Sequence, residues 1–579
     1  MGATTTRALE QTQPAPVKAE GSGRAIQTAI TIFCIGLLGI ALVPALIQMF
    51  LDKPLYYPDA RFTLGNIFAL FSDREVRATF GATFAFCSIV VVVSMVLGTC
   101  SAILIGRTDL PGRSAFLAIL LWPLFLSPQV IGFGAILAYG PSGLLTIWFS
   151  DLTGISDPWN LYSVPGMAII AGIAATPITT LYCLTAANQQ DPSQEAAARI
   201  AGASPLRILL RITLPIMRPA LIFALIMNLV NALETLAIPL IIGGPVGIKL
   251  LTTLIYDKSF EGAGLPQYGL VSALAFSLMA LVGVLFFLQR LALRQSHRFV
   301  SVGSKSVRPR TLPLGRWKWP AFVLVSLYVV FGIAVLVGAV FARSVTFILS
   351  PDVPFFDAFT LQNYSDVLSV EIYRRSILNT LLLAVMGGAL GTAFVAAVAL
   401  VAQRSNYRYR RVLDAFAQLP RVLPGLVVGL GVFYASVFLP VIDLLRNTIW
   451  LLLIAYLIRF LSSGYGIVSP ALFQITGDFD RAAKSVGAGW TKTMTRIVLP
   501  LSKQALLSCF ILLMILIIKE YSSAVFLKAP GSEVIGSTML SLWTQGLTGP
   551  VAALAVIQII LTAIMTSIVT RVLGVKLHG

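Results

Sequence analysis

Residues 195–215, EAAARIAGASPLRILLRITLP, form a basic and partly amphipathic stretch between two long apolar runs. A similar stretch returns 285 residues later at 480–500, DRAAKSVGAGWTKTMTRIVLP. In both copies an acid stands seven residues before a glycine, which stands thirteen residues before a Leu-Pro proline. The matched residues are Glu195, Ala197, Ala198, Gly202, Leu214 and Pro215 in the first copy and Asp480, Ala482, Ala483, Gly487, Leu499 and Pro500 in the second. This recurrence indicates a chain built from two related halves.

The segments around both copies are long enough to cross a membrane. The chain has 579 residues, 57% hydrophobic and 11% charged, whereas a soluble domain carries about 25% charged residues. A membrane helix needs about 20 apolar residues, and about twelve such runs are present. They are 26–50, 79–106, 115–140, 161–186, 219–243, 269–289, 320–342, 377–402, 415–440, 448–470, 504–527 and 551–573. Because the runs are continuous rather than alternating, they predict an all-α membrane protein and not a β-barrel.

A basic stretch at 290–319 divides these runs into two groups of six. An even number of helices in each group gives two parallel repeats in the same orientation, related by an axis along the membrane normal. Lys and Arg are concentrated in the loops on one side, which predicts that this side and both termini are cytoplasmic. We therefore expect a disordered tail at 1–25, a first repeat at 26–289 with a basic loop at 187–218, a linker at 290–319, and a second repeat at 320–579 with a basic loop at 473–503.

The remaining composition argues against catalysis by this chain. The five cysteines lie in apolar runs, and the two histidines, His297 and His578, lie on separate segments. This pattern contains neither a disulfide framework nor a metal-ligand set. No GxxxxGK[ST] phosphate loop is present, so we expect no nucleotide site. The net charge of +18 is explained by the cytoplasmic loops and does not indicate nucleic-acid binding.

Each repeated segment is predicted to form a short helix, a sharp turn and a second short helix. Asp191-Pro-Ser-Gln is a favourable helix start, and Gly202 permits the sharp turn at the helix end. Such a segment could simply rest on lipid headgroups, which would account for its arginines. Two copies that match in acid, alanine pair, glycine and proline favour docking to a partner protein instead.

These segments resemble the EAA loops of permease subunits from ATP-binding-cassette importers. In that family each loop forms a coupling helix that sits in a groove of one ATPase subunit. The resemblance therefore implies the type I importer permease fold, two ATPase subunits that bind ATP and Mg, an extracytoplasmic binding protein, and a multi-pass location among the lipids of a bacterial inner membrane. It implies no cofactor in this chain. Many family members carry an acid six residues before the glycine, where this chain has Ala196 and Arg481.

The fused arrangement is similar to that of the ferric-iron importer permeases. The stretches that carry this similarity are 234–256, 419–431, 455–461 and 519–540. The resemblance implies ferric iron as the substrate, with a phosphonate such as 2-aminoethylphosphonate, thiamine or a polyamine as alternatives. A secondary transporter driven by an ion gradient is the competing interpretation. It accounts for the helices but not for two matched docking loops.

Five charged residues interrupt the apolar runs, and charge at bilayer depth is usually functional. They are Glu234, Arg421, Arg459, Lys519 and Glu520, which are candidate residues of the substrate pathway. The repeat offset makes Glu234 equivalent to Lys519, so these two either pair between the halves or line the substrate pathway. Arg421 lies close enough to a helix end to extend toward the cytoplasm. The segment 462–466 after Arg459 is predicted to break its helix.

Prolines fall at matching places in the third helix of each half. They are Pro123 and Pro128 in the first half and Pro420 and Pro424 in the second. Because proline removes a helix hydrogen bond, we expect a kink at each place.

Overall fold

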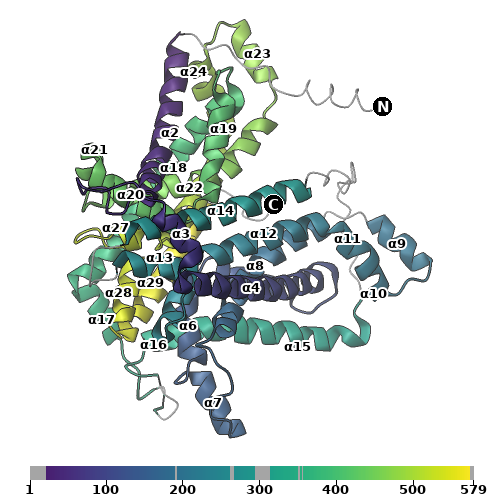
Figure 1. Ribbon diagram of the computed structural model, residues 1–579. Helices are drawn as coiled ribbons and strands as arrows, with labels where there is room; N and C mark the ends of the chain where they lie inside the picture. The colour runs from purple at the N-terminus through teal and green to yellow at the C-terminus, as the bar shows by residue number, and fades with distance from the viewer. Residues whose placement is uncertain are drawn as a thin grey trace. The chain divides into compact units, whose positions relative to one another are not determined.

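The computed structural model describes residues 21–188, 192–260, 267–293, 313–349, 353–354 and 356–573 (Figure 1). Within these ranges every regular element is a helix, and one isolated bridge joins Thr346 to Phe359. The described residues include nine helices long and apolar enough to cross a membrane, or up to 13 spans if each bent pair is one span. The all-α membrane fold is therefore confirmed. Most of the predicted tail and linker lies outside the described residues, and residues 21–25 already belong to the first helix.

The chain forms two compact units. Unit 1 comprises the described residues of Met1–Arg61, Val370–Thr538 and Ile560–Gly579, and unit 2 those of Phe62–Ser369 and Met539–Ile559. The elements of unit 1 are α2 (Gly21–Met49), α18 (Glu371–Arg404), α19 (Arg410–Gln418), η8 (Leu419–Val422), α20 (Gly425–Phe438), α21 (Pro440–Asp443), α22 (Ile449–Gln474), α23 (Asp478–Ser485), α24 (Trp490–Thr493), η9 (Met494–Val498), α25 (Leu499–Leu501), α26 (Lys503–Ile518) and α27 (Ala524–Leu527).

Unit 2 contains most helices of the first half and the first helix of the second. Its elements are α3 (Gly65–Ser72), α4 (Arg74–Arg107), α5 (Arg113–Leu121), η1 (Trp122–Leu124), α6 (Pro128–Tyr139), α7 (Leu144–Thr153), α8 (Val164–Asn188), α9 (Pro192–Ile200), α10 (Pro205–Ile208), η2 (Leu209–Thr213), α11 (Leu214–Ile216), α12 (Arg218–Glu234), η3 (Pro239–Gly243), η4 (Gly244–Val246), α13 (Leu251–Phe260), α14 (Tyr268–Leu293), η6 (Gly315–Trp317), α15 (Lys318–Val329), η7 (Val330–Ala334), α16 (Val335–Ser344) and α17 (Gln362–Ser369). Parts of α28 (Ile535–Thr544) and α29 (Thr548–Leu573) belong to each unit.

In unit 2, the helices α4, α8 and α12 pack against one another. A buried polar contact joins all three, because the Asn228 side-chain amide donates to Ser94 Oγ at 2.9 Å and to Thr179 Oγ1 at 2.7 Å. Apolar side chains gain little by leaving lipid for a helix interface, so polar contacts and close packing hold membrane helices together. This contact fixes how the three helices lie against one another.

In unit 1, the corresponding helices α18, α22 and α26 are packed through small residues. A Cβ on Gly464 would lie 2.8 Å from Val395 Cγ2 and 3.0 Å from Cys509 Sγ. The predicted break at 462–466 is therefore wrong, because α22 continues through this segment. The glycine allows close helix packing here instead of ending the helix.

Each unit includes the first helix of the other half of the chain. In unit 1, α2 packs against α20, where a Cβ on Gly431 would lie 1.7 Å from the Ala41 carbonyl oxygen. In unit 2, α16 packs against α6, where a Cβ on Gly134 would lie 2.4 Å from the Leu336 carbonyl oxygen. Only glycine permits these two backbone approaches. The predicted repeats are consecutive stretches of the chain. The compact units are not consecutive, because each contains the first helix of the other half.

The expected kinks in the third helices are present. In the first half, helical structure stops after η1 and resumes at Pro128, the first residue of α6. In the second half, the segments Arg410–Val422 and Gly425–Phe438 meet at a bend of 109°. Pro123 and Pro420 occupy the first turn of the short helices before each break, where a missing N–H is tolerated.

Candidate functional site

We call the helix–turn–helix formed by each repeated segment a knob. The first knob comprises α9, α10, η2 and α11 and leads into α12 (Figure 1). Gly202 ends α9 with φ of +79°, a conformation that glycine adopts without strain. The Ala203 N–H donates to the Ala198 carbonyl, and the Gly202 N–H donates to the Arg199 carbonyl, both at 2.9 Å. These two bonds are the Schellman ending of a helix. The chain therefore turns sharply where the sequence predicted, although the proposed helix start at Asp191 lies outside the described residues.

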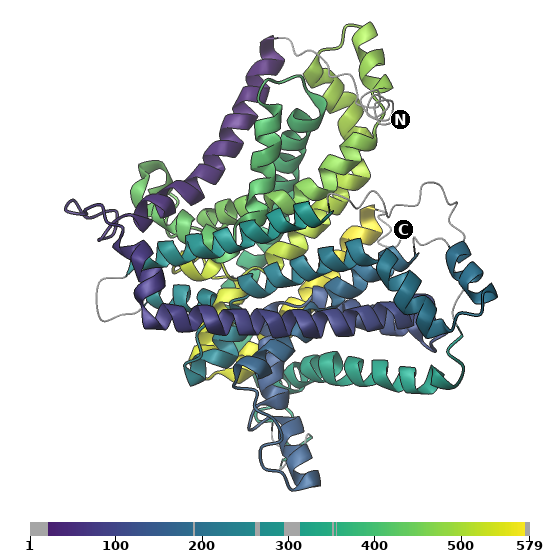
Figure 2. The same cartoon turned by 45° about the vertical axis from the view of Figure 1, so that its right-hand side comes forward.

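The second knob comprises α23, α24, η9 and α25 and has the same construction. Gly487 has φ of +73°, and the Ala488 N–H donates to the Ala483 carbonyl at 2.9 Å. Figure 2 gives a second view of this knob, coloured light green. The repeated turn shows that the two sequence copies specify the same local structure.

Both knobs join the next membrane helix through a wide turn and a bend. A π-helical turn, η2 or η9, precedes each Leu-Pro pair. The end of the knob and the following membrane helix meet at a bend of 64° in the first half and of 74° in the second. Because Pro215 and Pro500 have no N–H, the regular hydrogen-bond pattern cannot continue through them. The Leu-Pro pairs therefore lie in the last turn before each bend.

The acid of the first knob is buried inside its own unit. Glu195 forms an ion pair with Arg107, the last residue of α4, and the two side chains are 5% and 1% exposed. Glu195 Oε1 also accepts a hydrogen bond from Thr213 Oγ1 at 3.0 Å. The Arg107 guanidinium donates to the Ala187 carbonyl at the end of α8. One arginine thus ties the knob to two membrane helices.

The acid of the second knob is held in the same way. Arg404 is the last residue of α18, and its Nη2 lies 3.0 Å from Asp480 Oδ2. Arg404 also donates to the Ile475 carbonyl, and its own carbonyl accepts from Trp490 Nε1 at 2.9 Å. Burial raises the pKa of the Asp480 carboxyl above its ordinary value, while the Arg404 charge opposes that rise. The ionised pair therefore depends on the arginine remaining in place.

The knobs also expose apolar residues on surfaces that these pairs do not occupy. Ile200 and Val486 are 89% and 81% exposed and stand directly before the two turns. The first alanine of each predicted pair, Ala197 or Ala482, is also exposed. These residues are available to a partner, whereas the carboxylates of Glu195 and Asp480 are engaged internally. If the two acids contribute to coupling, they do so by holding the knob in position and not by contacting the partner.

Two of the predicted intramembrane charges form a pair in unit 1. Glu520 Oε1 accepts hydrogen bonds from Arg459 Nη1 at 2.9 Å, from Ser522 Oγ at 2.8 Å and from the Ser523 N–H at 3.0 Å. The chain approaches this cluster closely, because a Cβ on Gly425 would lie 1.0 Å from Arg459 Nη1. A buried charge is stable only with such partners. This pair is part of the second half alone, since Ala174 occupies the place equivalent to Arg459.

The other predicted charges lie at helix interruptions. Glu234 is the last residue of α12, and Lys519 directly follows α26, so both fifth helices stop at equivalent places. Broken helices at matched positions are a pointer to a transport pathway. Glu234 belongs to unit 2 and Lys519 to unit 1, so their pairing stays a prediction. Arg421 is exposed in the short helix η8.

After each break, the next helix is capped by an equivalent threonine. Thr83 Oγ1 accepts from the Leu251 N–H at 3.0 Å at the start of α13. Thr380 Oγ1 accepts from the Ile535 N–H at 2.9 Å at the start of α28. These caps satisfy two backbone N–H groups that have no partner within their own helices. They position the chain on the far side of each interruption.

The sequence interpretation missed the roles of Arg107 and Arg404. It counted both as cytoplasmic charges that set the topology. The sequence did contain a signal for these roles. Each of the two is the single arginine at the end of the second membrane helix of its half, so their positions match. Within the described residues, no three His, Cys, Asp or Glu side chains are grouped as metal ligands.

Comparison with known proteins identifies relatives of both halves. The sequence profile of the family described as "Binding-protein-dependent transport system inner membrane component" matches residues 94–296 and 389–573. The ferric transport system permease protein FbpB of Actinobacillus pleuropneumoniae is 27% identical over 81% of this chain and 67% of that protein. The putative ferric transport system permease protein FbpB 1 of Haemophilus influenzae is 28% identical over 76% of this chain and 69% of that protein. The sulfate transport system permease protein CysW of Synechocystis sp. is 29% identical over 36% of this chain and 75% of that protein.

Proposed function

Because the chain belongs to the family of binding-protein-dependent transport system inner membrane components, we propose that it is the membrane subunit of an ATP-driven importer of ferric iron. It is a multi-pass membrane protein with two permease repeats, as the paired family matches and the apolar helices indicate. The observation that carries the proposal is the presence of one matched, internally anchored knob in each repeat. Two knobs provide docking places for two ATPase subunits.

The mechanism follows from how each knob is attached. ATP binding closes the ATPase pair and moves the two knobs. Each knob is joined to the second and fourth membrane helices of its half through its buried acid and the arginine partner, and to the fifth through its Leu-Pro segment. A displacement of the knob therefore reaches three helices of the bundle together. The fifth helix of each half then carries the movement to its interruption at Glu234 or Lys519, where we place the pathway.

Ferric iron is proposed as the substrate on the basis of the relatives. Both ferric permeases align with more than three quarters of this chain, and therefore with both repeats. The sulfate permease aligns with 36% of the chain, which is about one repeat. In this proposal a binding protein delivers the iron on the side of the membrane opposite the knobs, and both termini are cytoplasmic.

Transport in proteoliposomes tests this function. The full chain would be reconstituted with its ATPase and binding protein, and uptake of radiolabelled ferric iron would be measured with and without ATP. Sulfate, thiamine, 2-aminoethylphosphonate and a polyamine would serve as competitors. We expect ATP-dependent iron uptake that survives an uncoupler and resists every competitor. Uptake that requires an ion gradient would support a secondary transporter, and competition by another solute would reassign the substrate.

A further inference from the structure

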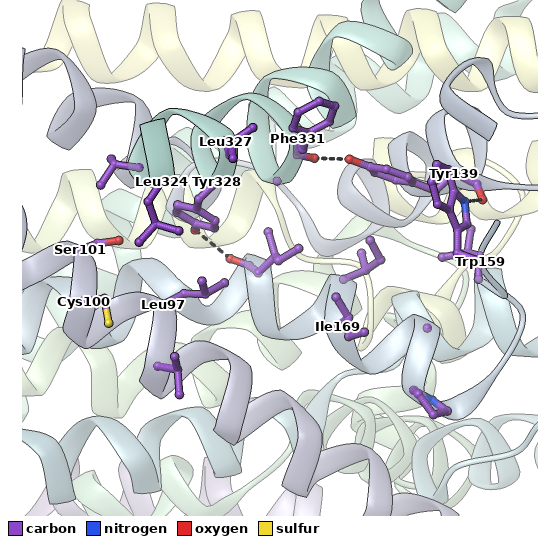
Figure 3. Close-up of a pocket in the computed structure, with 18 of the residues that line it drawn as sticks. Leu97, Cys100, Ser101, Tyr139, Trp159, Ile169, Leu324, Leu327, Tyr328 and Phe331 are labelled. Carbon is purple, nitrogen blue, oxygen red and sulfur yellow. Dashed lines mark hydrogen bonds between the residues drawn. The ribbon is translucent and has the colours of Figure 1, made fainter. Parts of the chain in front are cut away.

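Unit 2 contains an apolar groove of about 820 Å³ between α4, α8 and the helix that begins at α15 (Figure 3). Its walls include Leu97, Ile169, Leu324, Leu327 and Phe331. In Figure 2, α15 runs alongside α4 within this unit. None of its lining residues belongs to a knob or to a fifth helix, so the transport function proposed above does not use it.

The helices that form the sides of the groove place it at membrane depth. The helices on its sides belong to the spans Arg74–Arg107, Val164–Asn188 and Gly315–Ser344, which are long and apolar enough to cross a bilayer. Side chains on its rim are exposed and apolar, with 57% exposure for Val96 and 58% for Leu324. At this depth the surroundings are lipid chains and not water. The occupant must therefore be apolar over most of its length.

One end of the groove is polar and aromatic. Asn160 and Ser163 line it there, and the Trp159 Nε1–H donates to the Tyr139 carbonyl at 2.9 Å and to Thr146 Oγ1 at 3.0 Å. Trp and Tyr favour the boundary between lipid chains and headgroups. This end lies at the start of α8, whose other end leads toward the first knob. It therefore belongs to the leaflet opposite the knobs.

Two tyrosines hold the walls of the groove together. The Tyr139 hydroxyl of α6 donates to the Phe331 carbonyl in the π-helical turn η7. The Tyr328 hydroxyl of α15 donates to the Ile173 carbonyl of α8 at 3.4 Å (Figure 3). The wall that begins with α15 is thus attached to α6 and α8 beside the opening. These hydrogen bonds make the groove a fixed part of unit 2.

We propose that this groove binds one acyl chain of a phospholipid from the leaflet opposite the knobs, with the headgroup beside Trp159 and Ser163. An empty apolar space of this size would forfeit the dispersion contacts of its lining. A lipid chain restores them, and the polar end receives the ester and headgroup region. This proposal rests on the proposed function at one point only: the proposed function identifies the leaflet opposite the knobs as the outer leaflet.

Retention of lipid by the purified full chain tests the proposal. Val96→Trp fills the groove, and Val92→Trp is its matched control, since Val92 lies one turn away on α4, is 62% exposed and does not line the groove. Native mass spectrometry in detergent would count the retained phospholipid. We expect the wild type and Val92→Trp to keep a phospholipid that Val96→Trp loses. Equal retention by all three, or detergent alone in the wild type, would overturn the proposal.

Fluorescence quenching provides a second measurement. Cys100 lines the groove and is exposed, whereas Cys34, Cys87, Cys183 and Cys509 are buried. A bimane label on Cys100 should be quenched by lipids brominated on the acyl chain, and the quenching should survive detergent exchange. A label on Phe84→Cys in a Cys100→Ser chain faces bulk lipid, with Phe84 77% exposed, and should lose its quenching. Loss at both positions would contradict a bound chain.

These lipid measurements need no ATPase. Failure of the ATPase to bind would count against the proposed function and leave the lipid result unchanged. Failure to retain lipid would remove the groove proposal alone.

Discussion

Arg404 Nη2 lies 3.0 Å from Asp480 Oδ2, and the two side chains are 0% and 2% exposed. Arg107 and Glu195 form the equivalent buried pair in the first half. Both arginines end the second membrane helix of their half, and both acids lie on the first helix of a knob. The two knobs are therefore fixed to the membrane bundle by the same interaction, and the predictions begin with it.

Removing one member of a pair should release its knob. We expect Arg404→Ala to leave the Asp480 charge buried without its partner, at a cost of about 3–5 kcal/mol. Hydrogen exchange in Asp478–Ser485 should rise strongly, and less ATPase should copurify. The control is Arg481→Ala, because Arg481 and Asp478 form an exposed pair on the same helix, and exposed pairs contribute about 0–1 kcal/mol. Equal exchange in the two variants would contradict the anchoring role.

The turn glycines should tolerate asparagine better than valine. Gly202 and Gly487 have φ of +79° and +73°, and Asn occupies this region more readily than a β-branched residue does. Nothing lies within 4 Å of a Cβ at either position, so the backbone conformation and not crowding sets the cost. We expect ATPase copurification to fall in the order Gly, Asn, Val at both positions. Full copurification by the valine variants would refute docking through these turns.

Substitutions of Glu234 and Lys519 should distinguish a pair between these two residues from two residues that line the pathway. If they pair, each single Gln substitution lowers expression, and exchanging the two charges restores much of the loss. A buried pair that loses one partner is destabilised by about 3–5 kcal/mol. If they line a watery route, the single substitutions keep expression, alter transport and are not rescued by the exchange. Expression and transport would be measured for all variants, and unchanged values throughout would reject both roles.

Gly425→Ala should disrupt the Arg459–Glu520 pair. The new Cβ would lie 1.0 Å from Arg459 Nη1, so the guanidinium has to move away from Glu520. We expect lower thermal stability and lower transport. Gly466→Ala is the control, because it lies in α22 near Arg459 and meets nothing within 4 Å. A melting temperature for Gly425→Ala equal to that of the control would show that the pair does not depend on this close approach.

The linker at 290–319 should be accessible from the cytoplasm. Its basic composition favours that side of the membrane. A single cysteine placed in the linker, in a chain with Cys100 replaced, should react with a membrane-impermeant maleimide only after the cells are opened. Labelling of intact spheroplasts would instead place the linker outside and reverse the predicted topology of both halves.

The membrane architecture and both knobs were predictable from local sequence. A run of apolar residues identifies a membrane helix wherever that helix packs, because the requirement comes from the bilayer. The turns at Gly202 and Gly487 were also predictable, since a helix ending with positive φ favours glycine irrespective of its neighbours. The matched spacing of the two copies then identified the repeat.

Only the tertiary structure decided which charges are buried and which helices are neighbours. Arg107 and Arg404 have the sequence context of ordinary loop charges, yet each contacts an acid more than 70 residues away. The exchange of α2 and α16 between units depends on Gly431 and Gly134 meeting distant backbones. Likewise, Gly464 permits close packing where the local sequence predicted a helix break. A local sequence pattern indicates whether a segment is compatible with lipid and with a given backbone conformation. The contacts described above depend instead on which segments folding brings together.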